Sequence, residues 1–461
     1  MIADLKPYAD YKKSGLPWLG DIPEHWSSER AKWLFTKMDR PVREDDEVVT
    51  CFRDGTVTLR KNRRLRGFTE ATIYSGYQGI RRGDLVIHGM DAFAGAIGVS
   101  DSDGKGTPVY NVCQPGPGVS ANYYAHLVRQ MSHSQWILAL AKGIRERSTD
   151  FRFEMFGNQR VPLPPPDEQA AIVRFLDWAN RRLDRAIRAK RKVIALLNEQ
   201  KQAIIHRAVT RGLDPSVPLK PSGIPWLGEI PAHWEVRRIK YLLRECDERS
   251  STGDEQLLSM RMHHGLVVFA EHFSRAPQAA TLVGFKVVRP GQFVVNRMQA
   301  GNGVIFASDL TGLVSPDYAV FQPIGDANVT FLGELFRSRT VRAKFRAESK
   351  GLGTGTSGFL RLYNDRLGAI HVALPPRSEQ ADIVKGLGEE LFGLAAASSR
   401  LEREVDLLRE YRTRLVADVV TGKLDVREAA AQLPDEPAPQ EADAEEGPSD
   451  EQDRFSEEHS E

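Results

Sequence analysis

The sequence predicts an α+β protein in which two mixed α/β domains are separated by two long helices that pack together as an intramolecular coiled coil. Three observations predict it: an internal repeat, two long stretches with helical apolar spacing, and strand-like runs broken by turns between them. The expected limits are 1–165 and 214–376 for the domains, 166–213 and 377–425 for the helices, and 426–461 for an acidic tail.

The internal repeat has three anchors in the same order in both copies. Residues 14–26 read SGLPWLGDIPEHW and residues 222–234 read SGIPWLGEIPAHW, identical at ten of thirteen positions. Then VPLPPPDEQAAIV at 161–173 returns as VALPPRSEQADIV at 372–384, and AVTRGLD returns as VVTGKLD. A period above 200 residues is too long for a solenoid, so duplicated domains are expected. Either the divergent inserts have separate roles, or the duplication is purely structural.

A stretch with the apolar spacing of a long helix follows each proline-rich anchor. Proline keeps a helix from starting early, and Asp167-Glu168 and Ser378-Glu379 suit a first turn. Apolar residues then recur in steps of three and four, interrupted in the first copy by Lys190 and Lys201. Two helices of roughly 40 residues and about 60 Å are expected to pack together. The alternative is that each helix packs on its own globular neighbour.

The divergent inserts are predicted to be mixed α/β domains. The strand-like runs lie at 48–50, 84–88, 292–296 and 319–321. Helical stretches are predicted from Tyr123 to Ile144 and from Phe331 to Glu348. The local pattern does not predict the order of the strands.

Charge is unevenly distributed along the chain. Residues 434–461 contain twelve acidic residues and one basic residue, which leaves 62 basic and 50 acidic residues in 1–433, a net charge of +12. A basic folded part suits an anionic partner such as DNA. The tail, rich in Pro, Glu, Asp and Ser, is expected to be disordered.

The cysteine pattern and the hydropathy of the sequence indicate in which cellular compartment the protein is expected. Cys51, Cys113 and Cys246 form no CxxC pair, so neither a zinc ribbon nor a disulfide framework is expected. A reducing, cytoplasmic location fits best. The N-terminal residues lack the apolar region of a signal peptide, and no apolar run is long enough to span a membrane.

Candidate DNA-contacting residues in the first insert begin with a basic run, in which five of the seven residues 60–66 are Lys or Arg. The functional interpretation is phosphate binding, and the structural alternative is a solvated loop. Aromatic and polar residues able to contact base edges follow. The candidates are Arg60, Lys61, Arg63, Arg64, Arg66, Tyr77, Gln78, His88 and Asp91.

The second insert offers a similar set of Arg, Asn, Gln and His residues. Arginine suits guanine, and Asn or Gln suits adenine. The candidates are Arg261, His263, His264, Asn296, Arg297, Gln299 and Asn302. A metal site at the histidine pair is not expected, because no third ligand is near in sequence.

Signals for an enzyme are weaker. Residues 353–358 read GTGTSG, but a cofactor-binding loop needs a strand before it and a helix after it. Neither the N/D-P-P-Y/F tetrad of adenine methylation nor a phosphate-binding P-loop string is present. Asp317, Glu348 and Lys350 are the best hint of a magnesium-dependent nuclease. The two hypotheses are a non-catalytic DNA-reading subunit, and a self-contained nuclease or methyltransferase with built-in specificity domains.

The three anchors together resemble the specificity subunits of type I restriction-modification systems. The shared patterns are the SGxPWLGxIPxHW opening, the LPPxxEQxxIV segment before a long helix and the VxTxxLD ending. The resemblance runs from about residue 8 to residue 425, with two dissimilar target-recognition domains alternating with two similar helical regions.

This resemblance implies that the chain is non-catalytic and reads double-stranded DNA. Each recognition domain would take one half of a split, asymmetric target, and the antiparallel helices would fix the gap. The helices would also dock two modification subunits that methylate adenine, and restriction subunits would join them. S-adenosylmethionine, ATP and magnesium would be bound by these partners and not by this chain.

Overall fold

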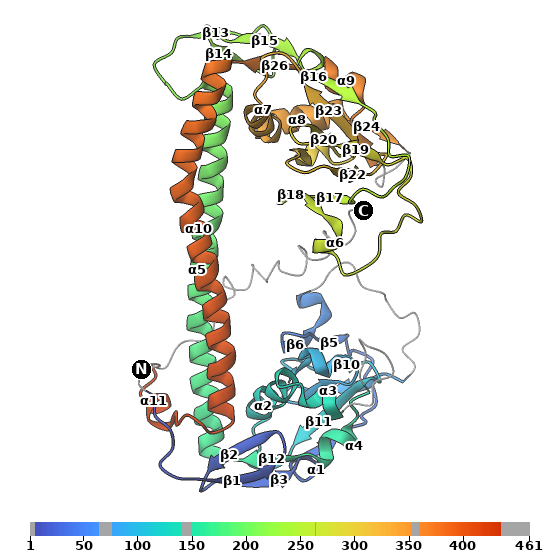
Figure 1. Ribbon diagram of the computed structural model, residues 1–461. Helices are drawn as coiled ribbons and strands as arrows, with labels where there is room; N and C mark the ends of the chain where they lie inside the picture. The colour runs from blue at the N-terminus through green and yellow to red at the C-terminus, as the bar shows by residue number, and fades with distance from the viewer. Residues whose placement is uncertain (1–4, 64–75, 141–149, 263, 353–358, 435–461) are drawn as a thin grey trace. The chain divides into compact units, whose positions relative to one another are not determined.

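A computed structural model describes residues 5–63, 76–140, 150–262, 264–352 and 359–434 (Figure 1). The chain divides into two compact units. Unit 1 comprises Met1–Arg188 and Val405–Glu461, and unit 2 comprises Ala189–Glu404. Each unit therefore contains one insert together with part of each long helix.

Unit 1 is built around a four-stranded antiparallel sheet in the order β4-β11-β8-β9. These strands are Phe35–Lys37, Tyr110–Pro115, Leu85–His88 and Ile97–Val99. The helix α2, Ala121–His133, packs against β8 and β9. Its buried residues join those of the sheet in one apolar core.

Smaller two-stranded ladders complete unit 1. They are β1 (Tyr11–Leu16) with β2 (Leu19–Pro23), β3 (Ser27–Arg30) with β12 (Arg160–Leu163), β5 (Val49–Cys51) with β6 (Val57–Leu59), and β7 (Gln78–Ile80) with β10 (Gly104–Gly106). The short helical segments are α1 (Ala31–Leu34), η2 (Arg60–Asn62), η3 (Ala92–Ala94), α3 (Trp136–Leu140) and α4 (Phe153–Asn158).

Unit 2 repeats this sheet in the order β16-β23-β20-β21. These strands are Leu243–Cys246, Ala319–Pro323, Phe293–Val295 and Ile305–Ala307. The helix α7, Val329–Arg337, replaces α2 against β21. The first residues of β8, β9 and η3 all lie 208 positions before those of β20, β21 and η5, so the two inserts share one topology although their sequences have diverged.

The remaining ladders of unit 2 are β13 (Leu219–Pro221) with β14 (Glu229–Pro231), β15 (Glu235–Arg238) with β26 (His371–Leu374), β17 (Leu258–Arg261) with β18 (Gly265–Val268), β19 (Lys286–Val288) with β22 (Gly312–Val314), and β24 (Lys350–Leu352) with β25 (Phe359–Arg361). The further helical segments are η4 (Ile239–Tyr241), α6 (Phe269–His272), η5 (Ala300–Asn302), α8 (Arg339–Glu348) and α9 (Asn364–Ala369).

The two long helices are α5, Pro166–Arg211, and α10, Arg377–Val420 (Figure 1). In unit 1 the beginning of α5 shares an apolar core with the end of α10. In unit 2 the end of α5 shares a core with the beginning of α10. The helices are therefore antiparallel partners, which confirms the predicted fold class of mixed domains joined by two long helices.

Charged pairs between the helices accompany the apolar contacts. In unit 1, Arg412 forms an ion pair with Asp184. In unit 2, the Lys190 Nζ lies 2.5 Å from the Glu404 carboxylate. The lysine that interrupts the apolar stripe thus has a partner on the opposite helix, which reduces the cost of placing a charge in the seam.

Both helical stretches predicted before the proline-rich anchors are divided in the structure. The first is α2 and α3, separated at Ser134 and Gln135, and Gln135 has a φ of 60°. The second is α7 and α8, separated at Ser338, whose extended backbone has a ψ of 148°. The Ser338 hydroxyl donates to the Leu335 carbonyl, a local hydrogen bond that competes with continued helix.

The start of the expected acidic tail is ordered. Residues 426–434 include the helix α11, Arg427–Ala431, and Val426, Ala430 and Leu433 are buried in the core of unit 1. These apolar residues recur in steps of four and three, so one helical face can be buried. The acidic run itself, from residue 435 onward, lies outside the described residues.

Within the described ranges, no helix is long and apolar enough to cross a lipid bilayer.

Candidate nucleic-acid interface

The repeated HW and EQ pairs meet in space and attach each insert to its helix. In unit 1, Glu168 on the first turn of α5 is 2% exposed. Its carboxylate accepts a hydrogen bond from the Trp26 indole at 3.0 Å and contacts the His25 ring at 2.8 Å. The Tyr8 hydroxyl donates to the same carboxylate. Three partners therefore satisfy this buried carboxyl group, which would otherwise lose its hydrogen bonds to water without replacement.

Unit 2 has the same arrangement with one difference. Glu379 accepts from the Trp234 indole at 3.0 Å and contacts the His233 ring at 2.6 Å. Position 216, which corresponds to Tyr8, is serine. The Glu379 side chain is correspondingly more exposed, at 28%.

The glutamine that follows each glutamate fixes the start of a helix in the insert. The Gln169 Oε1 accepts from the Ser120 backbone N–H at 2.8 Å, and Ser120 caps α2. The Gln380 Oε1 accepts from the Asn328 N–H at 2.7 Å, and Asn328 caps α7. The repeated motifs are thus a frame that holds both inserts in one orientation on the helices that carry them.

The basic run of the first insert begins on η2 beside β6. Lys61 forms an ion pair with Glu47, and Arg63 lies 2.5 Å from Asp54 and over the Phe52 ring. The Arg60 guanidinium donates to the Thr50 hydroxyl at 3.3 Å. Arg64 and Arg66 lie outside the described residues. The described part of the run is therefore paired on the protein surface, and phosphate binding by it stays a prediction.

The other candidates of the first insert surround the end of β8. His88 is 17% exposed and lies against the Tyr110 ring, and burial lowers the pKa of its imidazole. Asp91 forms an ion pair with Arg53 at 3.0 Å. Gln78 is buried, and its amide donates to the Tyr110 carbonyl at 2.8 Å, so it is not presented to solvent in this conformation. Tyr77, next to it, is half-buried.

Four candidates of the second insert surround the turn of η5. Asn296 is buried, and its side chain accepts from the Met298 N–H at 3.1 Å. The Arg297 guanidinium donates to the Asp317 carbonyl at 2.8 Å. Gln299 is the residue before η5, and Asn302 ends η5 and accepts from Arg346 at 3.0 Å. Gln299 and Asn302 thus lie on a turn whose neighbouring residues are fixed by hydrogen bonds.

The remaining candidates of the second insert lie on or beside the β17–β18 hairpin. The Arg261 guanidinium lies over the Phe273 ring at 5.2 Å. The His264 ring lies 6.0 Å from that of His272. His263 is outside the described residues.

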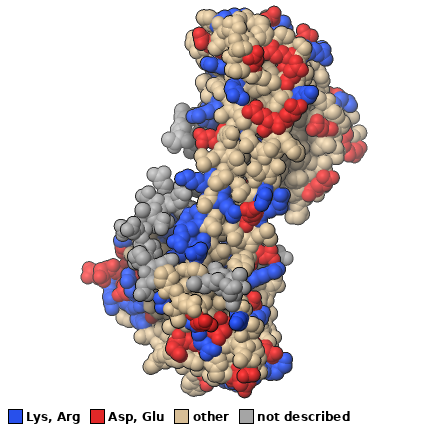
Figure 2. All heavy atoms as spheres, turned by 90° about the vertical axis from the view of Figure 1, so that its left-hand side faces the viewer, with Lys and Arg blue, Asp and Glu red and all other residues tan. Residues whose placement is uncertain are grey.

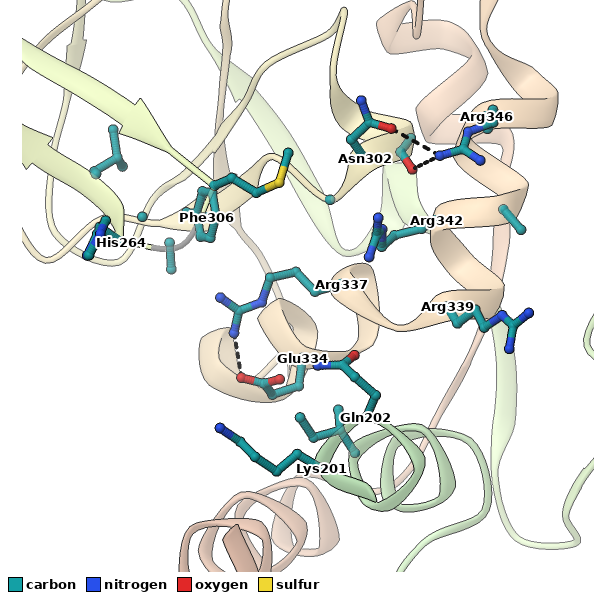
Figure 3. A pocket seen from close by; sticks show the side chains of 18 of the residues that line it. Lys201, Gln202, His264, Asn302, Phe306, Glu334, Arg337, Arg339, Arg342 and Arg346 are labelled. Carbon is teal, nitrogen blue, oxygen red and sulfur yellow. Dashed lines mark hydrogen bonds and ion pairs between the residues drawn. The ribbon is translucent and has the colours of Figure 1, made fainter. Parts of the chain in front are cut away.

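A cavity of about 1100 Å³ in unit 2 brings part of this set together with arginines that were not among the candidates predicted from sequence (Figure 3). His264 and Asn302 line it, together with basic residues of α5, α7 and α8. These basic residues are Lys201, Arg337, Arg339, Arg342 and Arg346. A detectable signal existed, because Arg339, Arg342 and Arg346 recur in steps of three and four on a predicted helix.

A cavity of about 610 Å³ in unit 1 has a different character. It lies at the end of β8 and is lined by Met90 and Gln78 together with three carboxylates and two basic residues. The carboxylates are Asp39, Asp150 and Glu154, and the basic residues are Lys37 and Arg152. The two inserts therefore share a topology but present concave surfaces of opposite charge balance.

Figure 2, which faces the side of the paired helices, shows basic and acidic side chains gathered in separate clusters. The densest basic run of the long helices is on α5, where seven of the twelve residues 181–192 are Lys or Arg. Such a run favours contact with a polyanion.

The two carboxylates that suggested a nuclease each have basic partners. Asp317 is paired with Arg361 at 3.6 Å, and Glu348 is paired with Lys344 at 2.5 Å and with Arg366 at 3.7 Å. No group of three or more His, Cys, Asp or Glu suited to a metal occurs within the described part of the chain. The 353–358 glycine string lies outside it.

The chain is similar to a curated relative and to several solved structures. No known family model matches the chain. A type I restriction enzyme specificity subunit, MjaVIII, of Methanocaldococcus jannaschii is 34% identical over 87 residues. That stretch covers 19% of this chain and 19% of the relative's length.

The solved structures cover much more of the chain. A chain from a study of complex assembly and conformational transition in the type I R-M system has a TM-score of 0.61 and 15% identity, and the match covers 87% of this chain and 98% of that one. The HsdS subunit from Thermoanaerobacter tengcongensis has a TM-score of 0.44 and 16% identity, with the same coverage. The first of these shows a shared fold over nearly the whole described length.

Proposed function

We propose that this chain, which has the fold of a type I restriction-modification specificity subunit, is the subunit that reads the DNA target of such a system. Each unit would read one half of a split, asymmetric target. The chain itself would supply recognition and assembly, and its partners would supply the chemistry.

The observation that carries this proposal is the pairing of a constant frame with divergent inserts. The frame is repeated down to the contacts of Glu168 and Glu379, whereas the inserts keep only their topology. One scaffold thus holds two different surfaces in equivalent settings. That arrangement suits two readers of unlike sequences better than it suits one active site.

The long helices would set the gap between the half-sites. Each helix has residues in both units, and at 1.5 Å per residue they extend about 65–70 Å. Apolar packing and ion pairs between the helices hold them in one register. A fixed spacing between half-sites follows from a fixed helix length.

The helices would also dock two modification subunits, which in turn would recruit restriction subunits. Large apolar side chains are exposed on both helices, among them Phe392 at 77%, Leu407 at 62% and Leu196 at 54%. These exposed side chains are the feature of the helices that supports docking of a protein partner. S-adenosylmethionine, ATP and magnesium would be bound by these partners, and the complex would act on DNA in the cytoplasm.

The competing hypothesis of a self-contained nuclease or methyltransferase has no support from the geometry of Asp317 and Glu348. Each of these carboxylates has a basic neighbour, and no other carboxylate joins either of them in a described group suited to a metal.

The test is to map methylated adenines across the genome of cells that express this chain with its neighbouring modification subunit, and of cells that lack it. A split motif with a constant gap that depends on this chain is the expected result. A contiguous motif would contradict the two-reader proposal. Methylation without the modification subunit would instead support the self-contained enzyme.

A further inference from the structure

The basic cavity of unit 2 lies between the insert and the helix that carries it (Figure 3). Its lining includes Lys201, Gln202 and Ile205 of α5 on one side and α8 on the other. Five basic residues line it against two carboxylates, Glu334 and Asp309. The excess of positive charge favours binding of an anion in the cavity.

The basic residues differ in their ion-pair and hydrogen-bond partners. The Arg337 guanidinium lies 2.5 Å from Glu334, and Arg346 donates to the Gly301 carbonyl and to Asn302. Arg342 projects into the cavity between them (Figure 3), and its Nε is buried without a hydrogen-bond partner. No carboxylate among the described residues forms an ion pair with it.

The setting of Arg342 disfavours its charge. Burial, and then the proximity of Arg346, lower the pKa of the guanidinium. A buried donor without an acceptor costs free energy, and a bound anion would recover it. Arginine is well suited to this role because its planar donors match the oxygens of phosphate.

We propose that this cavity binds a backbone phosphate of the DNA half-site read by unit 2, with Arg342 as its principal ligand. This proposal rests on the proposed function. Lys201 reaches the same cavity from α5, so one segment of DNA backbone would contact both the reading domain and the spacer helix. The half-site would then be fixed relative to the helix that sets the gap.

The surroundings favour DNA over a free phosphate. His264 and Asn302, two side chains able to contact base edges, line the same cavity. A site with a phosphate ligand beside base-edge donors and acceptors is the combination that positions and reads a duplex.

The first experiment measures DNA affinity of the full chain, purified with its modification subunit, over a series of salt concentrations. The probes are duplexes with the mapped target and with a scrambled second half-site. Arg342→Gln is expected to weaken binding about tenfold. It is also expected to lower the slope of log affinity against log salt by about 0.9, the value for one phosphate contact. Arg342→Lys should retain most of the slope, because it keeps the charge.

The matched control is Lys344→Gln, which removes one charge from the same helix at a residue that does not line the cavity. It should leave the slope unchanged. Equal slopes for wild type and Arg342→Gln, or equal losses for both variants, would overturn the proposal.

A second measurement begins with the wild-type chain, in which every side chain is retained. Single methylphosphonate substitutions, which remove one backbone charge, are placed in turn along both half-sites. A methylphosphonate at one position in the second half-site should weaken DNA binding by wild type. The same substitution should not weaken DNA binding by Arg342→Gln any further. The absence of any such position would overturn the proposal. Binding of millimolar inorganic phosphate at Arg342 that leaves DNA binding unchanged would also overturn it. If wild type shows no preference for the mapped target, the proposed function itself fails; if it reads the target and Arg342→Gln does so equally, only this inference fails.

Discussion

At the scale of single residues, the most consequential side chain is Glu168. Its carboxyl group is 2% exposed and is contacted by the Trp26 indole, the His25 ring and the Tyr8 hydroxyl. Glu379 has the same tryptophan and histidine, but it is more exposed and lacks a tyrosine. The two copies of one motif thus differ in how much stability depends on them.

We expect Glu168→Ala to destabilise unit 1 by about 3 kcal/mol, because it leaves buried donors unsatisfied, and Glu379→Ala to destabilise unit 2 by about 1 kcal/mol. Hydrogen–deuterium exchange of the full chain measures both, since peptides from the two units report separately. Equal losses in the two variants would mean that burial and the Tyr8 contact contribute little.

At the scale of elements, the paired helices combine apolar packing with charged contacts that fix their register. Lys190 with Glu404 and Arg207 with Glu390, 3.4 Å apart, both join α5 to α10 in unit 2. A slipped register would separate each pair and leave Lys190 unpaired in the seam. The helices are therefore suited to keep one length and one alignment, as a spacer requires.

Inserting seven residues into both helices, after Arg188 and before Val405, adds about 10 Å while keeping the apolar face in phase. We expect the gap in the methylated motif to lengthen by about three base pairs, at 3.4 Å per step, with both half-sites unchanged. Seven residues added after residue 434 are the control and should leave the gap as it was. A changed half-site would argue against the spacer role.

At the scale of the whole molecule, the protein consists of two copies of one unit whose insert sequences differ. The paired residues of β8 with β11 correspond to those of β20 with β23 at an offset of 208 residues, and η3 and η5 begin at the same offset. The described cavities of the two units lie at different places in the shared topology and differ in charge. The inserts can therefore change independently while the frame stays fixed.

Exchanging residues 31–159, the segment between the paired strands β3 and β12, for the insert of another chain of this fold should change one half of the methylated motif. The frame contacts of His25, Trp26 and Glu168 are retained in this design, so folding is expected to survive. The reciprocal exchange of residues 239–370 should change the other half. Methylation mapping reads both, and a change in both halves from a single exchange would contradict separate readers.

Much of this architecture follows from the sequence by itself. The repeat, the two long helices and the mixed character of the inserts are local or periodic properties: proline placement, apolar spacing in threes and fours, and short strand-like runs. The basic charge of residues 1–433 is likewise a property of composition alone. The family resemblance also rests on motifs that can be read without coordinates.

Only the tertiary structure decided how distant residues meet. The pairing of Trp26 with Glu168, the strand order β4-β11-β8-β9 and the breaks at Gln135 and Ser338 depend on contacts that local patterns do not encode. The same holds for the cavity, where Lys201 of α5 and Arg342 of α8 line one space although 141 positions separate them. Helix periodicity is set by neighbours a few residues away, whereas a sheet order or a binding cavity is set by which long-range contacts bury the most apolar surface.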